Sequence, residues 1–440
     1  MFGRRALIAA LVLLFGAGGA QAGSEGRAHT FSPEGLAKVS DYIRSEVAAG
    51  TFPGAILLLQ QHGKPVYYEN FGVRDVATEI SMSADTIFRL YSMSKPVTTV
   101  MAMMLVEEGK LSLDDPVAKY IPAFAKMKVG VETKAEDGKV ALALEPLSRP
   151  VTIKDLMRHT AGLPYGYYGG GLVNKLYADA GLFDNKALTN AELVAKITAL
   201  PLAEQPGTNW DYGHSTDVLG RIVEVISGKS LFGFEKERLL DPLGMTDTAY
   251  YVADPAKWPR VAEPMPQDRA ISPMTQIRDP RKPLRWESGG GGLVGTVGDY
   301  ARFSQMLLNG GSYAGRRYLK PETIALMASD HIGPETKIAR DQNYYPGGSL
   351  RLRPRFRGAH LGAIRDIVAA WRISLGRRRR HLLLHRSRRR PVRDLHGADP
   401  LAARPDSAGA EDADLSGDGT VASRLRSPDG ANGSARCAAR

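Results

Sequence analysis

Ser92 and Lys95 stand three residues apart at the start of a predicted helix, a spacing that can activate a serine hydroxyl. Side chains at this spacing lie on one helical face, so the Lys95 ammonium can sit beside the Ser92 hydroxyl. The helix N-terminus favours negative charge on that oxygen, and serine needs such neighbours because its free hydroxyl is a weak nucleophile. The alternative is a helix-capping serine followed by a surface lysine. The apolar helix expected from about Ser92 to Glu108 favours the catalytic interpretation, because it would hold both side chains rigidly.

A second candidate is Tyr212, which lies in a loop directly before another predicted helix. A tyrosine in such a place can be buried with only its hydroxyl reaching a cleft, where a nearby lysine would favour the ionised form needed in a general base. The alternative is a core tyrosine with a satisfied hydroxyl. His214 in the same loop suggests a Ser-His-Asp triad, but the Gly-x-Ser-x-Gly turn that usually accompanies one is absent. We therefore expect His214 to shape the loop or to face the substrate.

The other histidines, the glycine run and the cysteine indicate no further chemistry. His159 ends a predicted helix and is expected to bond its last carbonyls, a structural role. The nine histidines show no metal-ligand spacing, and Gly289–Gly292 is not followed by the Gly-Lys-Ser/Thr of a phosphate loop. The single cysteine, Cys437, allows no internal disulfide and makes a poor nucleophile. We predict no metal and no cofactor.

The elements that would position these residues are a mixture of helices and antiparallel strands. A helix is expected from Thr30 to Gly50, with Ser32 as its N-cap. Two strands joined by a tight turn should follow at 55–60 and 66–71, before the helix that carries Ser92. This order indicates a mixed α/β start rather than alternating parallel units. Further helices are expected at 153–159, 190–200, 215–227, 231–240 and 299–309.

The formal net charge of +11 comes from the last fifth of the chain. Residues 1–348 have equal numbers of basic and acidic side chains, whereas residues 349–440 contain 20 arginines, no lysine and 9 acidic residues. A nucleic-acid-binding domain would carry its basic residues on the folded surface. We therefore predict no nucleic-acid partner.

The first 22 residues have the pattern of a secretory signal peptide. Arg4 and Arg5 precede an apolar run from Ala6 to Phe15, and Ala20-Gln21-Ala22 is typical of a cleavage site. The apolar run is too short to span a bilayer. The pattern predicts a periplasmic or secreted protein with no stable membrane insertion after cleavage.

Taken together, the motifs of residues 30–348 resemble the serine β-lactamase, penicillin-binding protein and family VIII carboxylesterase superfamily, in particular its class C-like esterase branch. The resemblance implies an α/β fold in which helices flank an antiparallel sheet, built from the N- and C-terminal segments, with an all-helical insertion at about 111–283. Six motifs occur in order, namely Ser92–Lys95, Leu113–Val117, Leu156–Gly162, the Tyr212 loop, Asp241–Met245 and Gly291–Thr296.

The same resemblance implies the chemistry. Ser92 would attack the carbonyl of a small ester or of a β-lactam amide, Lys95 and Tyr212 would move its proton, and an acyl-enzyme would form. The oxyanion would be held by the Ser92 N–H and by an N–H from a C-terminal edge strand. Tyr91 and His214 would line the substrate pocket. The alternative is a catalytically inert penicillin-recognising scaffold, or a truncated and inactive product.

One departure from the family concerns the C-terminal part. The resemblance implies a hydrolase domain at 23–348. The family's third motif, His/Lys/Trp-x-Gly on an edge strand, is absent from the amino-acid sequence after Gly348. Suppose that GC-rich synonymous codons encode residues 350–360 and 372–387. If these codons are read one base later, they permit amino-acid sequences that resemble the missing strands. We predict that residues 349–440 are an out-of-frame translation and unstructured, the alternative being a genuine basic disordered tail. Resequencing codons 345–351 decides between them.

Overall fold

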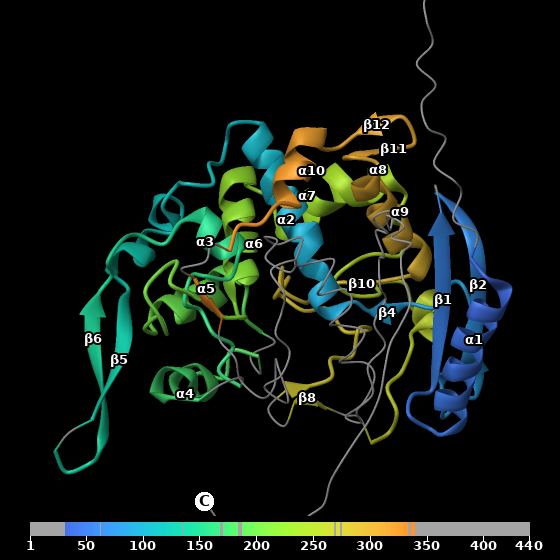
Figure 1. Cartoon of the computed structure of the whole chain (residues 1–440), viewed down its shortest axis with the longest axis horizontal. Coiled ribbons are helices and arrows are strands. Elements are labelled where there is room, and N and C mark those ends of the chain that lie inside the picture. The colour runs from blue at the N-terminus through green and yellow to red at the C-terminus, as the bar shows by residue number, and fades with distance from the viewer. Residues whose placement is uncertain are drawn as a thin grey trace, which may run out of the picture. The chain divides into compact units, whose positions relative to one another are not determined.

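The computed structural model describes residues 31–338, apart from 62, 135, 168–169, 184–186, 268–269, 273–274 and 333–335. All of these residues lie in the first of two compact units, residues 1–378 (Figure 1). The predicted signal peptide at 1–22 and the predicted tail at 349–440 lie outside the described residues.

The N-terminal elements are those expected from the sequence. Helix α1 spans Pro33–Ala48, and its N-cap Ser32 accepts a hydrogen bond from the Gly35 N–H at 3.3 Å. Gly50 follows the helix with a φ of 68°, a left-handed conformation that glycine adopts without steric cost. Strands β1 (Gly54–Gln61) and β2 (Lys64–Asp75) pair antiparallel, and β3 (Ile80–Ser81) pairs with β2 to give a sheet in the order β1-β2-β3.

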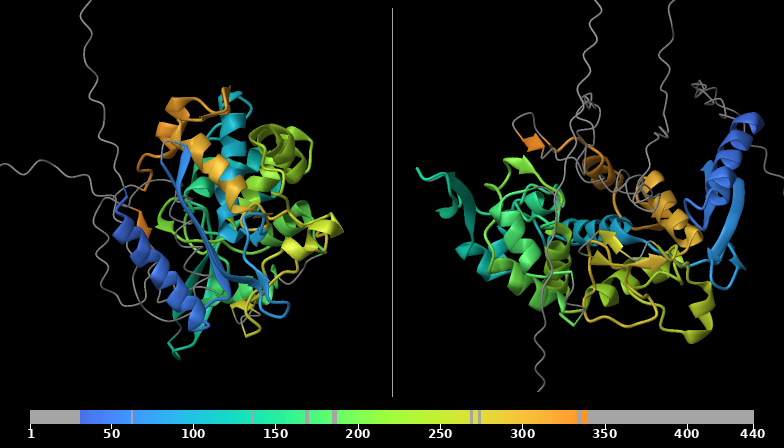
Figure 2. Two further views of the ribbon diagram at one scale, coloured as in Figure 1. Left: turned by 90° about the vertical axis from the view of Figure 1, so that its right-hand side faces the viewer. Right: turned by 90° about the horizontal axis from the view of Figure 1, so that it is seen from below.

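Helix α2, Ser94–Glu107, occupies the core of the unit and is preceded by a 3-10 turn at Tyr91–Met93. Every residue from Ser94 to Leu105 is buried, because valine, methionine, alanine and leucine occur on all sides of the helix. The turn explains why the regular helix begins two residues after Ser92. Figure 2 shows α2 surrounded by other helices in two further views.

The helices around α2 are mostly those predicted, with two additions. Four of the predicted helices are α3 (Ile153–Met157), α5 (Asn190–Thr198), α6 (Ser215–Ser227) and α9 (Val297–Leu308). The fifth, expected at 231–240, is α7 (Leu231–Glu235) continued by a π-helical turn at Lys236–Leu240 and by α8 (Asp241–Leu243). The additions are α4 (Leu172–Asp179) and α10 (Pro321–Met327).

The expectation of an all-helical insertion at about 111–283 is wrong, because this region also contains strands, the longest of which form a β hairpin. Strands β5 (Lys128–Lys134) and β6 (Val140–Pro146) pair antiparallel in continuous register. The turn between them contains Asp137-Gly138, and Gly138 has a φ of 82°. An Asp-Gly pair is a strong turn signal, because glycine adopts a positive φ without steric cost, and here it separates the two strands.

The remaining strands are short and join segments that are distant in sequence. Most relevant to the site, β4 (Phe88–Arg89) pairs with β10 (Val294–Gly295), which ties the segment before Ser92 to the glycine run. The C-terminal strands implied by the family resemblance lie outside the described residues. The other pairs are β7 (Asn209–Trp210) with β13 (Lys337–Ile338), β8 (Ala270–Ser272) with β9 (Thr275–Gln276), and β11 (Ser312–Tyr313) with β12 (Arg316–Arg317).

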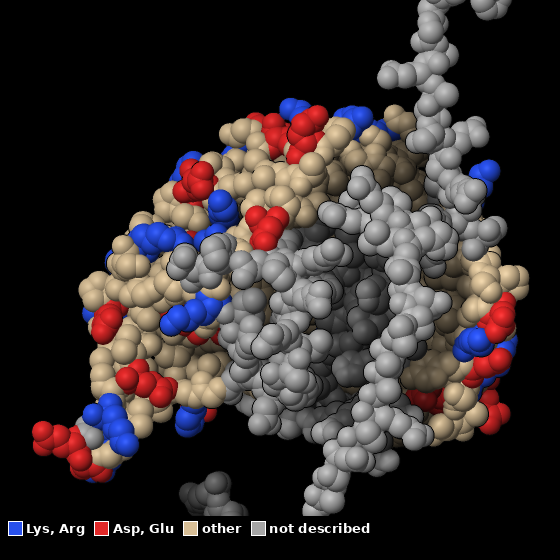
Figure 3. Space-filling model, viewed as in Figure 1, with Lys and Arg blue, Asp and Glu red and all other residues tan. Residues whose placement is uncertain are grey.

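Acidic and basic side chains are interspersed over the described surface visible in Figure 3. Within the described ranges, no helix has both the length and the apolar character needed to cross a bilayer.

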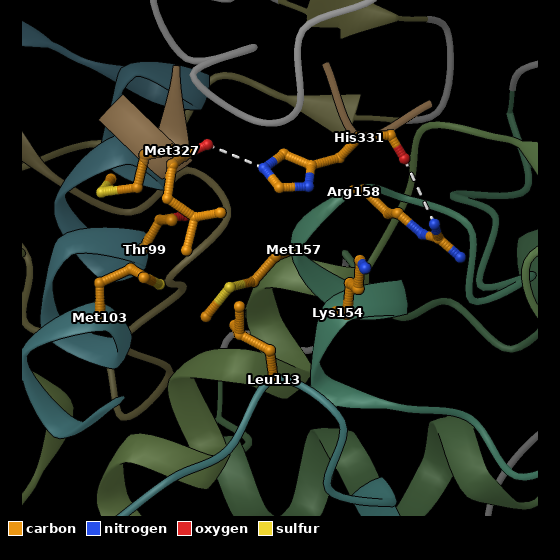
Figure 4. Close-up of a pocket in the computed structure, with 9 residues that line it drawn as sticks. Thr99, Met103, Leu113, Lys154, Met157, Arg158, Met327 and His331 are labelled. Carbon is orange, nitrogen blue, oxygen red and sulfur yellow. Dashed lines mark hydrogen bonds between the residues drawn. The ribbon is translucent and has the colours of Figure 1, made fainter. Parts of the chain in front are cut away.

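A buried carboxylate, Asp155, organises the start of α3. Its side chain has no exposed surface and accepts hydrogen bonds from Arg149 at 2.6 Å and from Arg158 at 2.8 Å. Burial alone would raise the pKa of Asp155, but the hydrogen bonds from Arg149, Thr152 and Arg158 lower it to about 2. Arg158 also donates to the His331 carbonyl at 3.3 Å, beside a hollow between α2, α3 and α10 (Figure 4).

We expect this carboxylate to contribute about 2 kcal/mol to the free energy of unfolding. Because its pKa is lower in the folded than in the unfolded chain, the contribution is complete above about pH 4 and is lost as the pH falls through about 2. Urea titrations at pH 6 and pH 2.5 should show the loss in the wild-type protein. The variant Asp155→Asn should lose about 3 kcal/mol or more at pH 6, since it leaves arginines unpaired. The control, Asp137→Asn in the exposed hairpin turn, should change little, and equal effects of the two variants would contradict this account.

Candidate active site

Ser92 lies in the 3-10 turn that connects β4 to α2, and the turn is held from both sides. The Ser94 hydroxyl donates to the Tyr91 carbonyl at 2.7 Å and accepts from the Leu293 N–H at 3.0 Å. Tyr91 has a φ of 45°, which is unusual for a residue with a side chain. Strained backbone of this kind persists only where the surroundings over-determine it and is common at active sites.

The structure brings Ser92, Lys95 and Tyr212 together. Lys95 Nζ lies 3.2 Å from Ser92 Oγ, and the Tyr212 hydroxyl lies 2.7 Å from the same oxygen. The Lys95 ammonium also lies over the Tyr212 ring, 4.4 Å from its centroid. Lys95 is only 3% exposed, whereas Ser92 and Tyr212 are half-buried. Ser92 and Tyr212 thus keep part of their surface accessible, while the charge of Lys95 is buried, where water screens it less.

Two further groups fix Lys95, and neither was predicted as a site residue. Its Nζ donates to the Gly290 carbonyl at 2.7 Å and to the Tyr165 hydroxyl at 3.1 Å. Gly290 belongs to the glycine run 289–292, which lacks the pattern of a phosphate loop. Tyr165 lies in the loop between Gly162 and Gly170, whose only sequence signal was its richness in glycine and tyrosine.

His159 positions the Tyr212 loop, in agreement with the structural role predicted for it, but through a different contact. Its Nδ1 accepts from the Gly213 N–H at 3.3 Å, and its carbonyl accepts from the Asp211 N–H at 2.9 Å. Its ring lies 4.7 Å from that of Tyr212. A side chain at Gly213 would lie 1.8 Å from the Leu163 carbonyl oxygen, so only glycine permits this close approach.

His214 does not line an open pocket, so the expectation that it faces the substrate is wrong for this structure. Its side chain has no exposed surface; Nδ1 lies 3.3 Å from the Asp217 carboxylate, and the ring lies 4.8 Å from that of Tyr165. The rings of Tyr165, Tyr177 and Phe183 lie around the imidazole and bury it. Its geometry corresponds to the loop-shaping alternative.

Asp217, in the first turn of α6, links His214 to the glycine run. Besides contacting His214, its carboxylate accepts from the Ser288 hydroxyl at 2.6 Å and from the Gly290 N–H at 3.1 Å. Burial would raise the pKa of Asp217, but hydrogen bonds from His214 and Ser288 and the charge of Lys95 hold it below its usual value. The carboxylate thus anchors Gly290, the residue whose carbonyl accepts from Lys95.

Tyr91, the other predicted pocket residue, is half-buried beside Ser92. Burial raises the pKa of its hydroxyl, although the positive charges of Arg89 and Arg278 act to lower it. Its contact with substrate remains a prediction, as does the second oxyanion donor, because the expected C-terminal strand lies outside the described residues.

The arrangement places an ammonium and a phenol hydroxyl within hydrogen-bond reach of one serine hydroxyl, and neighbours of this kind can activate a serine for acyl transfer. Among the described residues, no group of three histidine, cysteine, aspartate or glutamate side chains is placed to hold a metal ion.

Comparison with known proteins gives one family and several enzymes. The model of the β-lactamase family matches residues 39–356. Protein Rv1367c of Mycobacterium tuberculosis is 36% identical over 298 residues, which cover 67% of this chain and 72% of that protein. The lovastatin esterase of Penicillium rubens is 30% identical over 301 residues, with the same coverage of 67% and 72%.

Two solved structures resemble this one at comparable levels. EstCE1, described as a hydrolase with promiscuous acyltransferase activity, is 26% identical with a TM-score of 0.55, covering 69% of this chain and 80% of its own. The simvastatin synthase LovD from Aspergillus terreus is 25% identical with a TM-score of 0.55, covering 68% and 74%.

Proposed function

This chain belongs to the β-lactamase family, and on that premise we propose that it is a serine hydrolase that cleaves small esters through an acyl-enzyme on Ser92. The observation that carries the proposal is the convergence of Lys95 Nζ and the Tyr212 hydroxyl on one serine oxygen, at 3.2 and 2.7 Å. Relatives described as esterases and acyltransferases support the same class of chemistry.

The reaction begins from the phenolate form of Tyr212 beside the Lys95 ammonium. This phenolate takes the proton of Ser92 as Ser92 Oγ bonds to the ester carbonyl carbon. The C–O bond to the leaving alcohol then breaks, and the proton passes to that alcohol. Water attacks the acyl-enzyme by the reverse proton path and releases the carboxylic acid, which restores the Ser92 hydroxyl.

Lys95 supplies the electrostatic support for these steps. Its ammonium lies beside both the serine oxygen and the tyrosine ring, so it stabilises negative charge on either oxygen. The contacts with Gly290 and Tyr165 fix its position before the reaction, which avoids reorganisation in the transition state.

Three other outcomes are included in the proposal's test. In the first, the protein cleaves a β-lactam amide, which presents the same kind of carbonyl. In the second, it transfers the acyl group to an alcohol, which replaces water in the second step. In the third, it is an inert scaffold that binds without turnover. The purified full chain is assayed with a chromogenic short-chain ester, with a chromogenic cephalosporin, and with the ester plus an added alcohol. Release of chromophore from the ester supports the proposal. Binding without turnover of any of the three would replace it with the scaffold interpretation.

We also propose that the protein is exported to the periplasm or beyond, on the pattern of residues 1–22. N-terminal sequencing of the mature protein is expected to begin near Gly23. A mature protein that retains Met1 in the cytoplasm would contradict export.

A further inference from the structure

Glu235, the last residue of α7, is a buried carboxyl group that the proposed mechanism does not use. It has no exposed surface, and its Oε2 has no hydrogen-bond partner among the described residues. Its Oε1 lies 3.2 Å from the Thr98 hydroxyl and 3.4 Å from the Tyr250 hydroxyl. An ionised carboxylate in such a place would carry a large desolvation penalty.

Thr98 connects this carboxyl group to the candidate active site. It lies three residues after Lys95 on α2, on the same side of the helix, and its hydroxyl lies 3.1 Å from the Gly289 carbonyl. The next residue, Gly290, provides the carbonyl that accepts from Lys95 Nζ at 2.7 Å. The packing is tight, since a Cβ on Gly289 would lie 3.0 Å from the Thr98 methyl group.

The direction of these contacts depends on the protonation state of Glu235. A threonine hydroxyl has one proton, and a carbonyl oxygen can only accept. If Thr98 donates to Gly289, its oxygen must accept a proton from Glu235, which requires the neutral carboxylic acid. An ionised Glu235 would instead compete for the single Thr98 proton, and the charge-assisted bond would win.

The groups around Glu235 also favour its neutral form. Burial raises its pKa to about 8, and the charge of Glu287 adds to this; the hydrogen bonds that Thr98 and Tyr250 would donate to the ionised carboxylate act in the opposite direction. Tyr250 is itself buried, and burial together with Glu235, Glu287 and Asp217 raises its pKa, so it stays neutral. The contact from α2 is the uncharged Thr98.

We propose that Glu235 is a positioning residue: as a neutral carboxylic acid it directs the Thr98 hydroxyl to Gly289 and so holds the Gly290 carbonyl against Lys95. The consequence for catalysis rests on the proposed function of Ser92 and Lys95. Ionisation of Glu235 would release the Gly289 carbonyl, displace the Lys95 contact and slow acylation, since small displacements of catalytic groups cost orders of magnitude in rate.

The test compares the full-length wild-type chain with Glu235→Gln, which keeps the size of the side chain and a donor to Thr98 but cannot ionise. The matched control is Glu237→Gln, an exposed carboxylate two residues later that pairs with Lys229. Amide exchange is measured for a peptide covering 288–293, because the Gly290 and Leu293 N–H groups bond to Asp217 and Ser94. After correction for intrinsic exchange, protection in wild type should fall about 10-fold or more between pH 7 and pH 9.5. It should stay constant in Glu235→Gln, and Glu237→Gln should behave as wild type.

The catalytic consequence is measured separately, as the rate of Ser92 labelling by a fluorophosphonate probe over the same pH range. The ratio of the Glu235→Gln rate to the wild-type rate should rise about 10-fold from pH 7 to pH 9.5. In a Thr98→Val background this rise should vanish, because the connecting hydroxyl is gone.

Thermal unfolding shows whether each variant folds and whether Glu235 is neutral. Because the pKa is raised from 4.5 to about 8 in the folded chain, its contribution to stability is complete below about pH 4.5 and is lost as the pH rises through about 8. Wild type and Glu235→Gln should therefore unfold at similar temperatures at pH 4.5, and wild type should unfold at the lower temperature at pH 8.5.

The outcomes separate this inference from the proposed function. Identical exchange profiles for wild type and Glu235→Gln would overturn the positioning role, whatever the labelling shows. Different exchange profiles with no labelling of Ser92 in any variant would support the positioning role and refute the proposed catalysis.

Discussion

Replacement of Ser92 by alanine is expected to lower ester turnover by about 10⁴-fold or more and to abolish covalent labelling by a fluorophosphonate probe. The magnitude is that of removing the nucleophile from a serine hydrolase, where the residual rate comes from binding and oxyanion stabilisation alone. The structural basis is the position of Ser92 Oγ within 3.2 Å of Lys95 Nζ and 2.7 Å of the Tyr212 hydroxyl. The measurement is labelling of the purified chain followed by mass spectrometry of the modified peptide.

A matched control is Ser45→Ala, on the exposed side of α1, whose hydroxyl bonds only to the Tyr42 carbonyl of its own helix. This variant should be labelled and should turn over ester as wild type does. Labelling that persists unchanged in Ser92→Ala would show that another residue is the nucleophile.

Replacement of Tyr212 by phenylalanine is expected to lower turnover by about 10²-fold or more while the protein remains folded, the usual scale for loss of an acid–base group. The ring would keep its contacts with His159 and Lys95, so the loss would report the hydroxyl beside Ser92. Steady-state kinetics with the chromogenic ester, together with thermal unfolding, separate the loss of chemistry from the loss of fold.

His214 provides the discriminating comparison for this assignment. It is completely buried against Asp217 and Tyr165, so His214→Gln should act mainly on stability and on the shape of the loop. Tyr42→Phe, on an exposed helix face, is the neutral control. A loss of turnover in folded His214→Gln that far exceeds that in Tyr212→Phe would show that the base has been assigned to the wrong residue.

Most of the described fold could be predicted because its signals are local. Ser32 before Pro33 marks the start of α1, and the run of apolar residues after Ser92 predicts a buried helix, both of which are confirmed. The β-lactamase-like α/β fold was predicted from ordered motifs, and the family match and the solved structures confirm it. The β5–β6 hairpin was missed although its Asp137-Gly138 turn is also a local signal. The hairpin lies in a region where most of the predicted elements are helices, and the whole region was therefore predicted to be helical.

By itself the sequence determined that Ser92 and Lys95 share one face at the start of a helix, because the helical repeat fixes the geometry of residues three apart. It also placed Tyr212 in a loop before α6, where turn and capping signals are short-range. Only the tertiary structure decided what surrounds Lys95. The Gly290 carbonyl lies 195 positions away in the chain, and the Tyr165 hydroxyl lies 70 positions away. Such contacts arise from packing of α2 against α6 and the glycine run, and no periodicity in the sequence encodes which loop will meet which helix.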